Sequence, residues 1–364
     1  MNILDYVDWR GDLTFKERGF NEVDASILAQ FTLLDLDGIV ETNDISLEKV
    51  GEKYFEEKRH EKSLGLLSPL DVNGLLKKAI NSNRFKDIQL HHRINLYDEE
   101  KEMQITAFTC DLNRQNRVIL FSGTGDTLVA WKEDFNLMVE TPTPAQRVAV
   151  KYTEEQSRFY YGNLYIVGHS KGGNLTIYAA TFVKDDVKRR IVKAYAFDGP
   201  GLDEEHAKQM DDTTKRILLS INPEGSIVGR LFLHNEDVAI VKSDREGLYQ
   251  HDIFYWKVER DQFIRTNKYN QESDIVEKLV KGIMDRMTFQ EKVDFSNGLF
   301  KLLQGTGSKT LLEVLDNRKK LLDGAEGLSK EEKAILTRVS AELFKNSIVR
   351  RSVLTNIIFF RKGQ

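Results

Sequence analysis

Hydrophobic positions in the middle of the chain follow two periodicities. Short apolar runs rich in β-branched residues are typical of buried strands, whereas apolar residues that recur every three or four positions are typical of helices. Strands are expected at 88–112 (two strands around an acidic turn), 117–124, 164–168, 191–197, 216–222 and 237–243. Helices are expected at 24–36 (with Asp24 as its cap), 71–81, 127–139, 144–160 and 171–184, and again from about residue 272 onward.

Strands that alternate with helices predict a largely parallel sheet covered by helices on both faces. We expect this α/β core at residues 88–271, after an N-terminal extension or cap at 1–87. Residues 272–364 are expected to form a helical segment that packs on the core. The final stretch, 346–364, mixes apolar and basic residues, and we expect it to pack on the core or a partner subunit rather than on a membrane.

Composition narrows the class of protein. The 364 residues are 40% apolar, which is enough for one large or two modest domains, and the net charge of −4 with scattered basic residues argues against a nucleic-acid partner. The single cysteine, Cys110, excludes an internal disulfide, and the acidic start lacks a signal-peptide pattern. No run approaches the ~20 apolar residues of a membrane span. We therefore expect a cytoplasmic protein without a transmembrane segment, and the sequence leaves its oligomeric state open.

The strongest chemical signal is GHSKG at 168–172, which fits the pattern G-x-S-x-G. It stands between a predicted buried strand and a predicted helix, as a nucleophile elbow requires. Side chains at positions 168 and 172 would collide where strand and helix approach, so both glycines are needed. Ser170 is the expected nucleophile, and the N–H of Lys171, at the helix start, would face a developing oxyanion. The Lys171 side chain is expected on the outer face of the helix.

A second motif lies upstream, where the strand within 118–137 runs into Ser122-Gly123-Thr124 and a helix that carries Trp131 and Asp134. Together with FDGPG and QHD further on, these motifs resemble the class 3 (fungal-type) lipase branch of the α/β-hydrolases. More closely, they resemble a bacterial family of cytosolic hydrolase-like proteins related to those lipases. The resemblance covers roughly residues 105–260, and it implies an α/β-hydrolase fold in which Thr124 supplies the second oxyanion contact.

A serine nucleophile needs a base, and in this fold the chain order is serine, acid, histidine. His251, in a loop after the last expected strand, is favoured as the base over His234, and the resemblance agrees. The acid is left open between Asp198, at the end of the strand 191–197, and Glu224, in the turn after the strand 216–222.

A typical lipase carries its acidic residue at the position that aligns best with Ser226 in this chain. Asp198 is the preferred acid, because it stands at the carboxyl end of a strand.

These residues predict a serine hydrolase that cleaves an ester-type acyl substrate, lipid or small molecule, with no metal or organic cofactor. The alternative is a binding or regulatory protein on a hydrolase scaffold whose triad has decayed. The serine at position 226, where a lipase carries its acid, is the reason for considering it. A thioesterase or peptidase of the same fold is a further alternative.

Overall fold

The computed structural model describes residues 1–61 and 71–346. Within these residues the central sheet has nine strands in the order β1-β2-β3-β4-β5-β6-β7-β8-β11. The strands are β1 (Ile45–Ser46), β2 (Gln89–Asp98), β3 (Met103–Asn113), β4 (Asn116–Phe121), β5 (Asn163–His169), β6 (Ile191–Phe197), β7 (Leu218–Pro223), β8 (Asp237–Val241) and β11 (Arg265–Thr266). A separate two-stranded ribbon joins β9 (Val258–Glu259) to β10 (Gln262–Phe263).

Strands β4 to β8 are mutually parallel, and antiparallel strands flank them on both sides. In the register of the parallel strands, Phe121 lies beside Gly168, His169 beside Phe197, and Phe197 beside Ile221. The carboxyl ends of these strands are therefore aligned, so the loops that follow them gather at one edge of the sheet. The predicted sheet with a parallel centre is confirmed.

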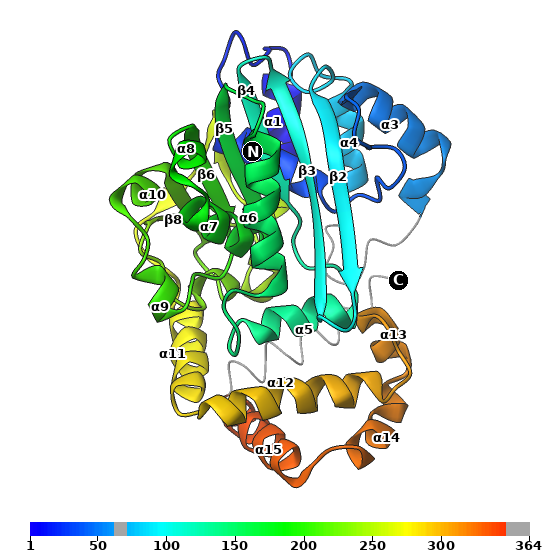
Figure 1. Ribbon diagram of the computed structural model, residues 1–364, viewed down its shortest axis with the longest axis vertical. Coiled ribbons are helices and arrows are strands. Elements are labelled where there is room, and N and C mark those ends of the chain that lie inside the picture. Colours follow the sequence, from blue (N-terminus) through cyan, green and yellow to red (C-terminus); the bar gives the residue numbers. More distant parts are fainter. Residues whose placement is uncertain (62–70, 347–364) are drawn as a thin grey trace.

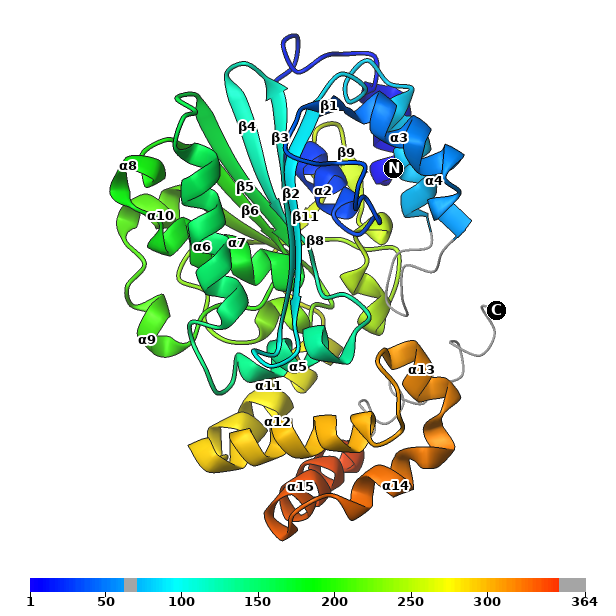
Figure 2. The ribbon, with the colours of Figure 1, turned by 45° about the vertical axis from the view of Figure 1, so that its right-hand side comes forward.

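Side chains of consecutive residues on the central strand β4 pack into two hydrophobic cores, one on each face of the sheet. Val118 and Leu120 pack with the N-terminal helices, while Ile119 and Phe121 pack with the helices of the opposite face. Figure 2 shows the two layers. One layer contains α1 (Ile3–Arg10), α2 (Glu22–Phe31), α3 (Leu47–Glu56) and α4 (Val72–Ile80); the other contains α6 (Pro144–Ser157), α7 (Lys171–Phe182), α8 (Asp185–Lys188), α9 (Glu204–Ala207) and α10 (Asp212–Ile217).

The C-terminal helices lie beyond α5 (Leu128–Asn136), past the end of the sheet where β4 stops (Figure 1). They are α11 (Gln271–Asp285), α12 (Phe289–Gln304), α13 (Leu311–Asp316), α14 (Leu321–Glu326) and α15 (Lys330–Lys345). Main-chain hydrogen bonds join this unit to the start of α5, from Leu128 to Lys309 (2.8 Å), and to the loop before it, from Leu311 to Asp126 (3.0 Å). The expectation for 346–364 falls almost entirely outside the described residues. Among the helices that the structure does describe, none combines the length and apolarity needed to cross a bilayer.

The cap of α2 differs from the prediction. Asn21 is the N-cap, and its side chain accepts from the N–H groups of Val23 and Asp24. Asp24 is instead the third helical residue, and its carboxylate is fully buried in a bidentate ion pair with Arg84 (2.6 and 2.5 Å). The sequence pattern could not distinguish these roles, because the partner of Asp24 lies 60 residues away.

Removing one member of this buried pair should destabilise the protein strongly. Arg84→Met leaves the Asp24 carboxylate without its counter-charge, so we expect a loss of about 3–5 kcal/mol in the free energy of unfolding, measured with urea. Arg18→Met is the matched control, because it breaks the largely exposed Arg18–Asp261 pair and should cost less than about 1 kcal/mol. Equal losses in the two variants would contradict this account.

Candidate active site

Ser170 occupies the turn between β5 and α7. Its backbone has φ 58° and ψ −124°, a conformation that residues with a Cβ rarely adopt. Its N–H donates to the Phe197 carbonyl on the neighbouring strand (2.9 Å), and its own carbonyl accepts from Gly173 (2.9 Å). These bonds hold a strained serine at the edge where the parallel strands end.

The glycines around Ser170 are required by close backbone contact. A Cβ at Gly168 would lie 2.0 Å from the Gly172 carbonyl oxygen, and a Cβ at Gly172 would lie 2.2 Å from the Phe121 carbonyl oxygen. Both separations are far below van der Waals contact, so the need for glycine predicted at these two positions is confirmed. The same packing brings β4, β5 and α7 together directly beneath Ser170.

Asp198 and His251 are in direct contact. Asp198 follows β6, is only 1% exposed, and its Oδ2 lies 2.7 Å from Nδ1 of His251, in the 3₁₀ helix η3 (Gly247–His251). A carboxylate at Nδ1 favours the tautomer with the proton on that nitrogen, which leaves Nε2 free to accept a proton. Of the two acids that the sequence left open, Asp198 is therefore the one that the structure brings to His251. The Glu224 main chain bonds to Val241 and Asn270.

Ser226 supports the same carboxylate. Its hydroxyl donates to Oδ1 of Asp198, and the Gly229 N–H reaches the same Oδ1 at 3.1 Å. The Asp198 carboxylate thus accepts from His251 through one oxygen and from the loop after β7 through the other. Ser226, at the position where the resemblance implies an acid, is therefore hydrogen-bonded to a carboxylate that follows the preceding strand.

His169 links the elbow to His251. The two imidazole rings lie 4.6 Å apart between centroids, at 33°, and Nε2 of His169 donates to the His251 carbonyl (2.9 Å). Burial, assisted by the neighbouring His251, holds the pKa of His169 well below its ordinary value and so favours the neutral form of this ring. Sequence reasoning did not select His169, although its place next to Ser170 was the available signal.

The loop after β4 lies against the elbow. A Cβ on Gly123 would sit 3.1 Å from the His169 carbonyl oxygen and 3.5 Å from the Ser170 Cβ. One residue further on, the Thr124 hydroxyl donates to Oδ2 of Asp134 on α5 (2.5 Å). Thr124 is thereby held beside the turn that carries Ser170.

The Lys171 side chain corrects an expectation. It does not lie on the outer face of α7: its Nζ is buried, 2.8 Å from Oε2 of Glu133 on α5 and 2.7 Å from the carbonyl oxygen of Gln104 on β3. No local pattern indicates this contact, because its partners lie 38 and 67 residues upstream.

Other polar groups near the end of the sheet form separate contacts. His234, the weaker base candidate, pairs with Glu236 (2.6 Å), whose Oε1 also accepts from Ser220. Asp252 accepts from the Phe254 N–H (2.9 Å), and burial raises the pKa of its carboxyl to about 6. The hydrogen bonds described for His234 and Asp252 therefore go to groups other than Asp198 and His251.

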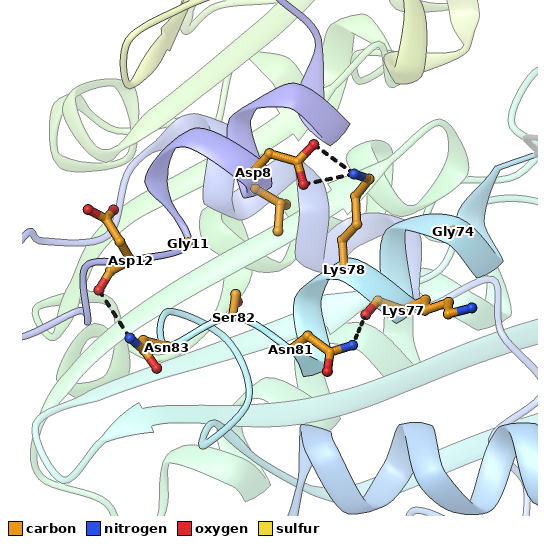
Figure 3. A pocket seen from close by; sticks show the side chains of 10 residues that line it. Asp8, Gly11, Asp12, Gly74, Lys77, Lys78, Asn81, Ser82 and Asn83 are labelled. Carbon is orange, nitrogen blue, oxygen red and sulfur yellow. Dashed lines mark hydrogen bonds and ion pairs between the residues drawn. The ribbon is translucent and has the colours of Figure 1, made fainter.

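A cavity of about 680 Å³ lies elsewhere, between α1 and α4 (Figure 3). Its lining includes Asp8 and Lys78, which form an ion pair across it (2.6 Å), and none of its lining residues belongs to the site around Ser170. The size of this cavity therefore does not make it the candidate active site.

The parallel sheet, with an elbow serine and a histidine–aspartate pair at its carboxyl edge, defines an α/β-hydrolase fold. The chain belongs to the Mbeg1-like family, whose profile matches residues 79–301. No curated protein matches it.

Among solved structures, it is similar to M37 lipase, with 17% identity over 44% of this chain and a TM-score of 0.34. It spans 62% of the length of that lipase. It is also similar to a triacylglycerol lipase from Penicillium expansum, with 14% identity over 51% of this chain and 76% of that one, and a TM-score of 0.34.

Asp134 should make stability depend on pH. Burial raises the pKa of its carboxyl to about 6, above that of the unfolded chain, so the fold prefers the neutral form. Stability from this group is present at pH 4 and is lost as the pH rises through 6, by roughly 3 kcal/mol at pH 7. Asp134→Asn stays neutral, so its stability relative to wild type should rise by that amount from pH 4 to pH 7.

Urea unfolding at several pH values measures this difference. Asp316→Asn, at an exposed position, should show a nearly constant difference from wild type. A pH-independent difference for Asp134→Asn would contradict the effect of burial.

Proposed function

We propose that the protein is a serine hydrolase that cleaves ester-type acyl substrates with Ser170 as nucleophile, His251 as base and Asp198 as the acid that orients it. The observation that carries this proposal is the 2.7 Å hydrogen bond between His251 and the buried Asp198, at the sheet edge that also presents Ser170. The strained backbone of Ser170 supports it as well, since such strain is common where geometry serves a reaction.

In the proposed reaction, Nε2 of His251 takes the Ser170 hydroxyl proton while Oγ bonds to the carbonyl carbon. The carbonyl electron pair moves onto oxygen, which gives a tetrahedral oxyanion. When the oxyanion collapses, the bond to the leaving alcohol breaks and the imidazolium gives that alcohol its proton. Water then attacks the acyl-serine by the same two steps, which releases the acid and restores Ser170.

The main-chain N–H groups of Thr124 and Lys171 are the proposed oxyanion donors. Lys171 is the first residue of α7, where N–H groups have no helical partner and the helix dipole favours negative charge. The contact between Gly123 and the elbow supports a role for the Thr124 loop in the same hole.

The rival function, a binding protein on a decayed hydrolase scaffold, drew its support from Ser226. Because the Ser226 hydroxyl donates to Asp198, a serine at that position is compatible with a complete triad. The substrate class is left open among lipid esters, small esters and thioesters, because the same reaction at the carbonyl carbon cleaves all three. The proposal also includes a cytoplasmic location, which rests on the single, buried Cys110.

A fluorophosphonate probe tests the proposed nucleophile. The wild-type protein should be labelled covalently, Ser170→Ala should not be labelled, and His251→Ala should react about 10³-fold more slowly, because the hydroxyl loses its base. Ser157→Ala is the matched control: Ser157 is buried on α6, and its loss should leave labelling unchanged. A folded wild-type protein that is never labelled would favour the binding protein.

The acid assignment has its own test in the turnover of p-nitrophenyl esters of graded acyl length. Asp198→Asn should lower kcat by about 10³–10⁴-fold, because the amide no longer holds the productive tautomer of His251. Glu224→Gln, the same chemical change at the other candidate, should keep kcat within about threefold of wild type. The reverse ranking of the two variants would transfer the role to Glu224.

A further inference from the structure

Lys171 and Glu133 form a nearly fully buried ion pair next to the proposed nucleophile. Their side chains are only 5% and 2% exposed, and Nζ lies 2.8 Å from the carboxylate. Burial of two charges costs several kcal/mol per ion unless hydrogen bonds compensate it. Here the Glu133 carboxylate also accepts from the N–H groups of Gln104 (3.1 Å) and Ala145 (2.9 Å), so the pair is joined to β3 and α6.

Helix α5 holds both proposed oxyanion residues through two consecutive carboxylates. Glu133 binds the Lys171 side chain, and Asp134 binds the Thr124 hydroxyl. The two loops that must meet at one substrate oxygen are thus attached to the same turn of one helix.

A second connection runs through Gln104. Its carbonyl accepts from Lys171 Nζ (2.7 Å), and its side-chain oxygen accepts from the hydroxyl of Thr127, which also caps the start of α5 (3.1 Å to the Ala130 N–H). The buried lysine is therefore connected to the start of α5 through Gln104 and Thr127, and to a later turn of the same helix through Glu133.

We propose that Glu133 and the Lys171 side chain are positioning residues that fix the separation of the Thr124 and Lys171 amides in the oxyanion hole. This inference rests on the proposed function. Both amides must lie 2.7–3.1 Å from the same developing oxyanion, and a displacement of about 1 Å costs roughly 10²-fold in rate. The ion pair opposes such a displacement, because separating the two loops would leave buried charges without partners.

The double variant Lys171→Met/Glu133→Gln tests the proposal. It removes both charges, keeps the volume of each side chain and leaves the main-chain amide at 171 in place. With a p-nitrophenyl ester, kcat should fall about 10²-fold while KM stays within about threefold, because the oxyanion exists only after attack. Circular dichroism at the assay temperature checks that the variant is folded. A kcat within threefold of wild type in the folded variant would overturn the proposal.

A matched control removes another buried ion pair. Asp24→Asn/Arg84→Met neutralises a pair that is equally inaccessible but lies in the N-terminal layer, and its kcat should stay within about threefold of wild type. An equal fall in both double variants would show a general effect of lost stability and would also overturn the proposal.

Hydrogen exchange gives a readout that does not depend on activity. In the Lys171→Met/Glu133→Gln variant, amides at 122–128 should exchange roughly tenfold faster than in wild type, while those of α4 are unchanged. If wild type reacts with neither the ester nor a fluorophosphonate, the proposed function fails, and the exchange rates alone decide whether the pair positions the loop. Unchanged exchange at 122–128 rejects the positioning role. Should the double variant unfold, Glu133→Asp, which keeps both charges but shortens the side chain by one methylene, is measured in the same two ways, with the same expected directions.

Discussion

The close approach of β4, β5 and α7 is the constraint on which the rest of the site depends. A Cβ at Gly168 would lie only 2.0 Å from the Gly172 carbonyl oxygen, so no side chain fits at this crossing. The turn between them must therefore reverse within one residue, which places Ser170 at positive φ. The same crossing brings the ends of β4 and β6 next to that residue, so the loop that carries Thr124, the proposed oxyanion loop, and Asp198 lie close to it without long excursions of the chain.

Around this crossing, the C-terminal helices contact the loop that carries Ser226 and the helix α5, both of which lie next to the candidate site. The Ser273 hydroxyl on α11 donates to the Ser226 carbonyl, and Arg230 pairs with Asp274 (2.7 Å), so the loop that supports Asp198 is bound to α11. On the other side, Ser296 on α12 donates to Asn136 at the end of α5 (3.0 Å). Helices that follow the sheet in sequence thus stabilise loops that belong to its centre.

The sequence predicted the features that depend on local pattern. Apolar runs located the central strands, and the glycines with Ser170 predicted the strained turn, because strand, turn and helix are contiguous. It left the proposed acid open between Asp198 and Glu224, because the hydrogen bonds of Ser226 and Gly229 to Asp198 depend on how the loop after β7 folds back against β6. It also misplaced Asp24 and the Lys171 side chain, because both have partners that are distant along the chain, Arg84 and Glu133. The boundaries of the N-terminal extension, core and C-terminal segment stay predictions.

The Lys171–Glu133 pair also affects how the site meets charged molecules. A lysine next to the proposed nucleophile in sequence suggests attraction of anionic ligands, yet its charge is compensated at 2.8 Å by a carboxylate and is shielded from solvent. Such a closely paired dipole produces only a weak field at a distance. The pair therefore adds little to long-range electrostatic steering.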